Sequence, residues 1–310
     1  MSLPTPSPAD LSRQAPLPAP VLRAVAAAAI MALGLGIGML ATHGLAGAAD
    51  GFATRLVPAA LVTLVVVPAI LLLRRRWDRR RFEALGLGAP MDGAKSLALG
   101  IGIVGGCGAA GLAVASFAGG IAWGRVDVPA LLAFLAVNAV IALLLEALPE
   151  ELSIRGYALA ALRSRYGRAA SAWIATALFM AVPAVLLLAQ GLLTRWLGGG
   201  AAIPLAPGDD GALLYYGTLA AFSAMLIFAR EATLGASIWT CVGAHLAFLT
   251  VNRILLGVPG TGVELETSAG VRGFVFAAYV TAAIVAFALL RDRADARRRV
   301  AGAVAGSGRS

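Results

Sequence analysis

Acidic side chains are concentrated in one short segment of an otherwise weakly charged chain. The segment "EALPEELSIRGY", from Glu146 to Tyr157, carries three glutamates and an arginine within ten positions, although only 13% of the 310 residues are charged. It follows a long apolar run, where ionisable groups are costly and mark a functional site by default. The sequence therefore predicts chemistry at this segment.

The spacing within this segment divides the glutamates by role. Pro149 lacks an amide proton, so we expect a break there and a new helix near Glu150, whose first turn would favour acidic residues. Glu151 and Arg155 are four positions apart, share a face and are expected to pair. Glu150 lies about 100° further round the helix, so its carboxylate is expected to point elsewhere and stay free. Such a group could act as a general base toward water.

A second candidate lies in a later apolar run. His245 is about 12 residues into that run, roughly 18 Å along a helix that rises 1.5 Å per residue, and Asn252 follows on the same face. A lone buried histidine is commonly a packing residue, so His245 becomes a site residue only if it faces Glu150. The alternative for the acidic segment is a wetted cluster at a helix end, an interpretation that Glu146 fits best. His43 has no motif around it.

Composition indicates what must position these residues. Hydrophobic residues make up 60% of the chain, whereas soluble domains are about 45–50% apolar and about 25% charged. Runs of about 18 or more apolar residues recur along the chain, and each is long enough to cross a hydrocarbon core of roughly 30 Å. The sequence predicts an all-α, polytopic membrane helical bundle of about eight transmembrane helices, over residues 21–46, 54–73, 94–118, 128–148, 169–194, 212–229, 233–256 and 271–290.

Basic residues indicate the orientation of this bundle. With the N-terminus in the cytoplasm, the basic segments 74–81, 163–168 and 291–299 share that side. Of the 25 Lys and Arg residues, the outer side then holds only Arg55, Arg125, Arg195, Arg253 and Arg272. The positive-inside rule predicts this asymmetry. The net charge of +9 is therefore interpreted as membrane orientation, with both termini cytoplasmic and no nucleic-acid partner.

A glycine-rich motif in the third span has a packing explanation. The segment "GIGIVGG" contains G-x-G-x-x-G at Gly100, Gly102 and Gly105. A dinucleotide site would need a preceding strand in a soluble βαβ unit, which the run does not predict. Small residues in membrane helices allow close approach of a neighbouring helix, which is the expectation here.

Two motifs resemble those of the CPBP family of intramembrane proteases, which includes the CAAX prenyl proteases and bacterial Abi proteins. "PEELSIRGY" resembles the first motif, Glu-Glu-x-x-x-Arg followed by glycine, through Glu150, Glu151, Arg155 and Gly156. "REATLGASIWTCVGAHLAFLTVN" is similar to the family's small-residue and tryptophan stretch before an intramembrane histidine, here His245. The resemblance covers roughly residues 128–256.

The resemblance implies an intramembrane endopeptidase of a bacterial inner membrane, acting on a membrane-embedded or lipid-modified peptide or protein. Glu150 would activate the water, and Glu151 and Arg155 would support it. His245 would orient water or stabilise the oxyanion, with Asn252 as a supporting residue.

The chain departs from the family's other motifs. Pro183 stands where the Phe-x-x-x-His motif beginning at Phe179 has histidine, and Leu249 replaces the asparagine of His-x-x-x-Asn, with Asn252 one turn further on. A catalytic zinc site usually has three protein ligands. The sequence supplies too few in matching positions, so we expect no metal and no cofactor. A non-catalytic binding or scaffold protein and, more weakly, a transporter remain alternatives.

The expected organisation follows the motifs. Residues 1–20 form a disordered cytoplasmic tail, 21–127 the N-terminal transmembrane helices, 128–256 the protease-like core, 257–290 the last transmembrane helix and 291–310 a basic cytoplasmic tail.

Overall fold

The chain folds as a bundle of long apolar helices. The computed structural model describes residues 19–45, 51–78, 82–196, 206 and 211–307. Within this part, eight helical spans are long and apolar enough to cross a membrane, which confirms the predicted all-α membrane bundle. Seven are built around the single helices α2 Pro20–Gly44, α3 Phe52–Leu73, α4 Pro90–Phe117, α8 Arg168–Trp196, α9 Ala212–Glu231, α10 Ile238–Leu255 and α11 Ala269–Ser307.

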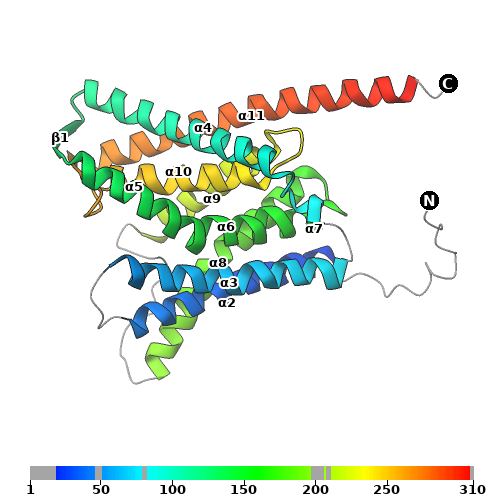
Figure 1. The fold of residues 1–310 in the computed structure, drawn as a ribbon, viewed down its shortest axis with the longest axis horizontal. Helices are drawn as coiled ribbons and strands as arrows, with labels where there is room; N and C mark the ends of the chain where they lie inside the picture. The colour runs from blue at the N-terminus through cyan, green and yellow to red at the C-terminus, as the bar shows by residue number, and fades with distance from the viewer. Residues whose placement is uncertain (1–18, 46–50, 79–81, 197–205, 207–210, 308–310) are drawn as a thin grey trace.

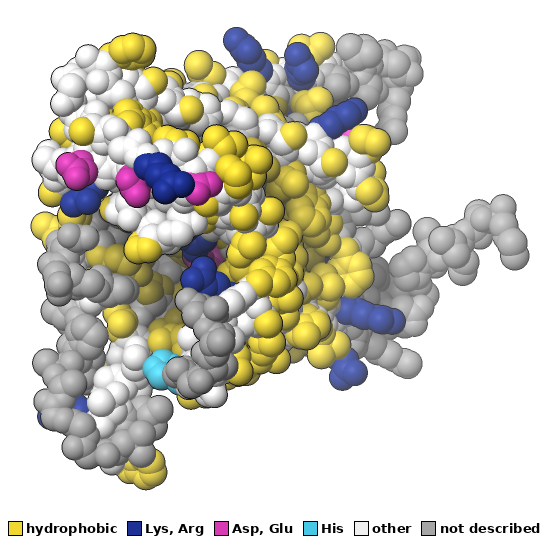
Figure 2. All heavy atoms as spheres, turned by 60° about the vertical axis from the view of Figure 1, so that its left-hand side comes forward, with side chains coloured by type: hydrophobic (Ala, Val, Ile, Leu, Met, Phe, Trp, Pro, Cys, Tyr) yellow, Lys and Arg dark blue, Asp and Glu magenta, His cyan; other side chains and the backbone are white. Residues whose placement is uncertain are grey.

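The fourth span lies between two groups of helices. It runs from Val128 to Arg163 through α5 Val128–Ala142, η3 Leu143–Ala147, α6 Leu148–Glu150, η4 Glu151–Ala158 and α7 Leu159–Arg163. In Figure 1, α2 and α3 lie side by side below it, and α4, α10 and α11 lie above it. Figure 2 shows hydrophobic side chains covering much of the flank of the molecule, as expected of a surface that faces lipid.

The expected helix break at Pro149 is wrong. The helix continues through the proline, and π-helical turns, η3 and η4, lie on either side of it. A π-turn widens the hydrogen-bond ladder by one residue, which makes room for a ring that would clash in an α-helix. Glu150 and Glu151 therefore lie in the interior of a long helix and not at a new N-terminus.

Glycines bring α4 and α10 into close contact, as the sequence predicts. A Cβ atom at Gly100 would lie 2.2 Å from the Thr240 carbonyl oxygen, and one at Gly243 would lie 2.1 Å from the Leu97 carbonyl oxygen. Gly102 and Gly105 face open space, so only part of the motif serves this contact. Because α10 carries His245, this contact fixes the height of that histidine against α4.

A buried charge cluster ties the ends of three spans together. Asp78, the last residue of η1 Arg74–Asp78, accepts hydrogen bonds from Arg23 on α2 and from Arg74, each at 2.6 Å, and from Tyr157 on η4 at 3.3 Å. All four side chains are nearly inaccessible to solvent. The basic segment 74–81 is thus partly a structural joint that holds α2 and α3 against the motif-bearing helix.

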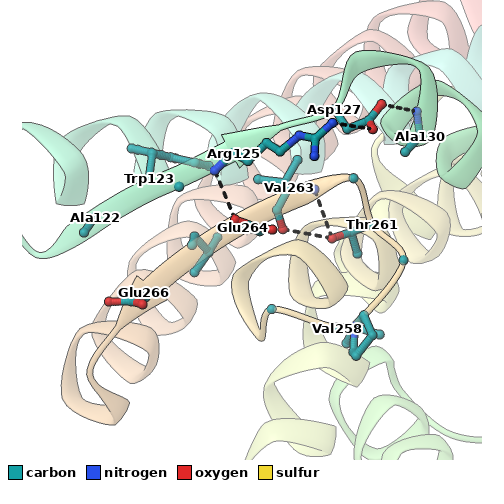
Figure 3. A pocket seen from close by; sticks show the side chains of 16 residues that line it. Ala122, Trp123, Arg125, Asp127, Ala130, Val258, Thr261, Val263, Glu264 and Glu266 are labelled. Carbon is teal, nitrogen blue, oxygen red and sulfur yellow. Dashed lines mark hydrogen bonds and ion pairs between the residues drawn. The ribbon is translucent and has the colours of Figure 1, made fainter.

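Two short strands at the other end were not expected. β1 Ile121–Val126 and β2 Val263–Thr267 pair antiparallel, and a short 3-10 turn, η2 Phe82–Leu85, precedes α4. Figure 3 shows the polar pocket beside the strands, where Glu264 accepts from the Arg125 amide at 3.2 Å. None of the motif residues lines this pocket.

Two further expected boundaries differ in the structure. The seventh span begins at Ile238 and not at 233, because a turn precedes α10. Ser237 is the N-cap of α10, and its hydroxyl oxygen accepts from the Trp239 amide at 3.3 Å. α11 does not end at residue 290 but continues to Ser307, so most of the expected basic tail is helical. The expected N-terminal tail lies outside the described residues, apart from residues 19 and 20.

Candidate active site

Glu151 is the centre of a buried polar cluster. It has no solvent-exposed surface, and its Oε1 atom lies 2.9 Å from His245 Nδ1 and 3.4 Å from Arg155 Nη1. The expected pair of Glu151 and Arg155 is therefore formed. The second partner, His245, was expected beside Glu150. One carboxylate oxygen thus joins the first motif on η4 to the histidine on α10.

Glu150 reaches the same cluster and does not point elsewhere. One ligand atom from each of Glu150, Glu151 and His245 lies within 4.8 Å of the other two. Glu150 is half-buried, whereas Glu151 and His245 are at most 1% exposed. Among the three, Glu150 is the accessible carboxylate. The widened turn of η4 accommodates both adjacent glutamates on the side facing α10.

His245 lies closer to the helix start than predicted. It is the eighth residue of α10, about 10 Å along the axis at 1.5 Å per residue, because the helix begins later than expected. The imidazole packs edge-on against the Phe222 ring of α9, with centroids 4.7 Å apart. Phe222 is a wall residue of the site that the sequence motifs do not identify.

α8 also contacts the site, although its histidine is replaced. The Arg155 guanidinium lies 4.2 Å from the centre of the Phe179 ring, a cation–π contact. Phe179 begins the segment that has Pro183 in the histidine position. Pro183 lies inside α8, where a proline donates no backbone hydrogen bond and brings no ionisable group.

A second polar cluster lies one turn before Glu150. Glu146 Oε1 lies 3.4 Å from Arg253 Nη2, and Arg253 also donates to the side chain of Asn138, which bonds Thr250 at 2.8 Å. Asn138 is 5% exposed. Glu146 is therefore a half-buried ion-pair partner, and Arg253 belongs to the last turn of α10. Asn138, a polar residue in an apolar run, was the signal that pattern matching overlooked.

Asn252 does not join the Glu150 cluster. Its Nδ2 atom donates to the Phe248 carbonyl oxygen at 2.9 Å and to Tyr279 Oη at 2.6 Å. Two turns from His245, it links α10 to α11. His43 is similarly remote, since its Nδ1 atom is 2.8 Å from the Met39 carbonyl oxygen of its own helix and its surface is exposed.

The cluster contains the donors for a metal ion but is poorly suited to one. Glu150, Glu151 and His245 are close enough together to share a cation, and Glu151 Oε2 is buried without a partner among the described residues. However, Glu151 Oε1 is already bonded to His245 Nδ1 and to the permanent positive charge of Arg155. A cation there would be repelled by that guanidinium, which already compensates the charge of Glu151. The reaction proposed for these residues therefore includes no metal ion.

Comparison with known protein families identifies the core that carries this cluster. Residues 132–251 match the family model described as "Type II CAAX prenyl endopeptidase Rce1-like". No curated protein and no solved structure matches the chain significantly. The matched segment includes the whole first motif and His245. The helical core formed by residues 132–251 therefore belongs to the Rce1-like family of CAAX prenyl endopeptidases.

Proposed function

We propose that this protein is an intramembrane endopeptidase in which Glu150 activates a water molecule. The observation that carries the proposal is the convergence of Glu150, Glu151 and His245 within 4.8 Å inside an apolar bundle. Membership of a protease family supports hydrolysis of a peptide bond as the reaction. The substrate class is a peptide or protein that is embedded in, or attached by a lipid to, the same bilayer.

The burial of the three groups supports a division of roles. Glu151 accepts from both Arg155 and His245, so its negative charge is compensated and its geometry is fixed. Among the described residues Glu150 has no hydrogen-bond or ion-pair partner, and it is the most exposed of the three, so it is the group available to a water molecule. In the proposed orientation, water reaches it from the cytoplasmic side.

In the proposed reaction, Glu150 takes a proton from water and later returns it to the leaving amine. Glu150 accepts a proton from water as the water oxygen bonds to the scissile carbonyl carbon. The negative charge then moves to the carbonyl oxygen, where a His245 ring protonated on both nitrogens could donate from Nε2 while Nδ1 donates to Glu151. When the C–N bond breaks, the proton held by Glu150 passes to the leaving amine.

A labelling experiment tests hydrolysis and identifies its products. Purified protein is reconstituted in vesicles with candidate membrane-anchored peptides in water enriched in ¹⁸O, and products are analysed by mass spectrometry. Hydrolysis predicts one ¹⁸O atom in each new C-terminal carboxylate and none in a Glu150→Gln reaction. The absence of any cleaved product for all candidates, or equal cleavage by the variant, would contradict the proposal.

One set of observations favours a second candidate, a non-catalytic binding protein of the same fold. Pro183 and Leu249 replace two residues of the family pattern, and Asn252 bonds Tyr279 instead of the cluster. This candidate predicts a stable, uncleaved membrane partner that copurifies equally with the wild type and with Glu150→Gln. Recovery of that partner only as cleaved fragments from the wild type would exclude it.

We also propose the topology stated from the sequence, with α11 extending past residue 290 into the expected C-terminal tail. The positions of the basic residues support cytoplasmic termini and an outer β1–β2 pair, and the two motifs support a catalytic core over residues 128–256. In this orientation the Asp78 joint lies at the cytoplasmic face.

A further inference from the structure

The proline in the acidic motif leaves one carbonyl group of the helix without its backbone donor. In η3 the Leu148 amide donates to the Leu143 carbonyl oxygen, which is the five-residue spacing of a π-turn. The next bond in this register would run from residue 149 to the Leu144 carbonyl oxygen. Residue 149 is proline and has no amide proton, so that bond cannot form.

A neighbouring helix supplies the missing donor. The hydroxyl group of Thr63, on α3, donates a hydrogen bond to the Leu144 carbonyl oxygen, and α3 packs directly against η3. Thr63 is partly buried and is the polar side chain of the run "LVTLVVV". In lipid a freed carbonyl group needs a partner inside the protein, so the contact has a physical cause.

On the basis of the proposed function, we propose that Thr63 is a positioning residue for the catalytic glutamate. Leu144 lies two residues before Glu146 and six before Glu150, on the same continuous helix. The hydrogen bond holds this helix in its π register against α3. A return to the α register would rotate the residues on one side of the turn by about 100° relative to the other. Glu150 would then leave its position beside Glu151 and His245.

Ser153 supports this explanation from the other side of the proline. Its hydroxyl group donates to the Pro149 carbonyl oxygen at 2.7 Å, and both groups are buried. That bond lies within one helix and accompanies the second π-turn, η4. Thr63 differs because it reaches Leu144 from outside, and it can therefore couple the orientation of the acidic segment to α3.

The test exploits the fact that the chain has only two histidines. Protein labelled with ¹⁵N-histidine gives ring signals from His43 and His245 alone, and a His43→Gln variant assigns them. Thr63→Val is nearly isosteric but cannot donate. We expect it to shift the His245 signals and leave His43 unchanged, while Thr63→Ser restores the wild-type spectrum. Thr194→Val, which removes a hydroxyl bond made within α8, is the matched control.

A double variant separates positioning from a general packing role. Pro149→Ala restores the amide of residue 149, which can donate to Leu144 in the existing register. In that background Thr63→Val should no longer shift the His245 signals. A shift that persists unchanged with Pro149→Ala, or no shift in Thr63→Val alone, overturns the inference.

Kinetics provide the second measurement and distinguish the two proposals. If the wild type cleaves a membrane peptide, Thr63→Val should lower kcat at least tenfold with little change in KM, and Thr63→Ser should recover most of it. Equal kcat in Thr63→Val would refute the positioning role while leaving the proposed function intact. If neither the wild type nor any variant cleaves a membrane peptide, the proposed function fails, and the histidine spectra still decide the role of Thr63.

Discussion

At the scale of single residues, the site depends on how Glu151 distributes its hydrogen bonds. One buried carboxylate oxygen serves both an arginine and a histidine, while its second oxygen has no partner among the described residues. The Arg155 guanidinium makes a cation–π contact with Phe179, and the Arg155 backbone carbonyl oxygen accepts a hydrogen bond from Arg230 at 3.3 Å. These contacts fix Glu151 in place, and we propose that its neighbour, Glu150, is the carboxylate available to water.

Removal of one partner from this buried pair should be costly. We expect Arg155→Met to destabilise the protein by about 3–5 kcal/mol, because it leaves the Glu151 charge buried and uncompensated. The exposed pair of Arg168 and Asp295 is the control, and Arg168→Met should cost about 0–1 kcal/mol. Thermal unfolding in detergent, followed by circular dichroism, measures both. Equal losses of stability in Arg155→Met and Arg168→Met would contradict the greater importance of the buried Glu151–Arg155 pair.

The metal prediction also belongs to this scale. Because the Arg155 guanidinium competes with a cation for Glu151, we expect purified protein to contain well under one equivalent of zinc. We also expect cleavage to survive treatment with a chelator. Elemental analysis checks the content. One equivalent of zinc that is lost in His245→Ala would show that the cluster is a metal centre.

Part of the site could be predicted from the sequence because its spacing is local. The pairing of Glu151 with Arg155 follows from four residues along a helix, and the motif marked His245. The pairing of His245 with Glu151, and the link from Glu146 to Arg253, depend on how α10 packs against the fourth span. No repeating pattern in the sequence shows how far α10 is shifted along its axis relative to the fourth span.

At the scale of elements, the π-turns around Pro149 determine where the acidic groups face. A proline in an apolar run is typical of a helix end, so the sequence favours a break. Inside a membrane protein, neighbouring helices can satisfy the freed carbonyl group, and here Thr63 on α3 does so. The break was predicted because this tertiary partner lies more than 80 residues away.

The contact between α4 and α10 gives a prediction with an internal control. A methyl group at Gly243 would meet the Leu97 backbone at 2.1 Å, whereas Gly102 faces open space. Gly243→Ala should therefore destabilise the bundle by about 1–3 kcal/mol, as overpacking does, and Gly102→Ala should change its stability little. Melting temperatures of the two variants measure this. A Gly243→Ala protein as stable as Gly102→Ala would contradict the close packing.

At the scale of the whole molecule, hydropathy alone predicted the number and order of the spans. The boundaries were less well predicted, because the ends of α10 and α11 depend on caps, turns and ion pairs. Arg298 on α11, for example, donates to the Thr233 carbonyl oxygen at 2.8 Å, which keeps the helix against the turn before α10. The β1–β2 pair was missed because its strands are separated by more than 130 residues.

The orientation of the bundle can be tested by labelling from outside the cell. In a cysteine-free background, Arg125→Cys places a thiol beside the β1–β2 pair, and Arg297→Cys places one on exposed α11 surface. We expect a membrane-impermeant maleimide to label the first in intact cells and the second only after lysis. The reverse pattern would overturn the cytoplasmic assignment of the termini.

The central claim is that Glu150 is the general base, and a comparison with its neighbour tests it most directly. Glu146 lies one turn away and is also half-buried, but it pairs with Arg253. On one cleaved membrane peptide, we expect Glu150→Gln to lower kcat by about 10²–10⁴, while Glu146→Gln stays within a few fold of wild type. Unchanged kcat in Glu150→Gln, or an equal loss in both variants, would contradict the account.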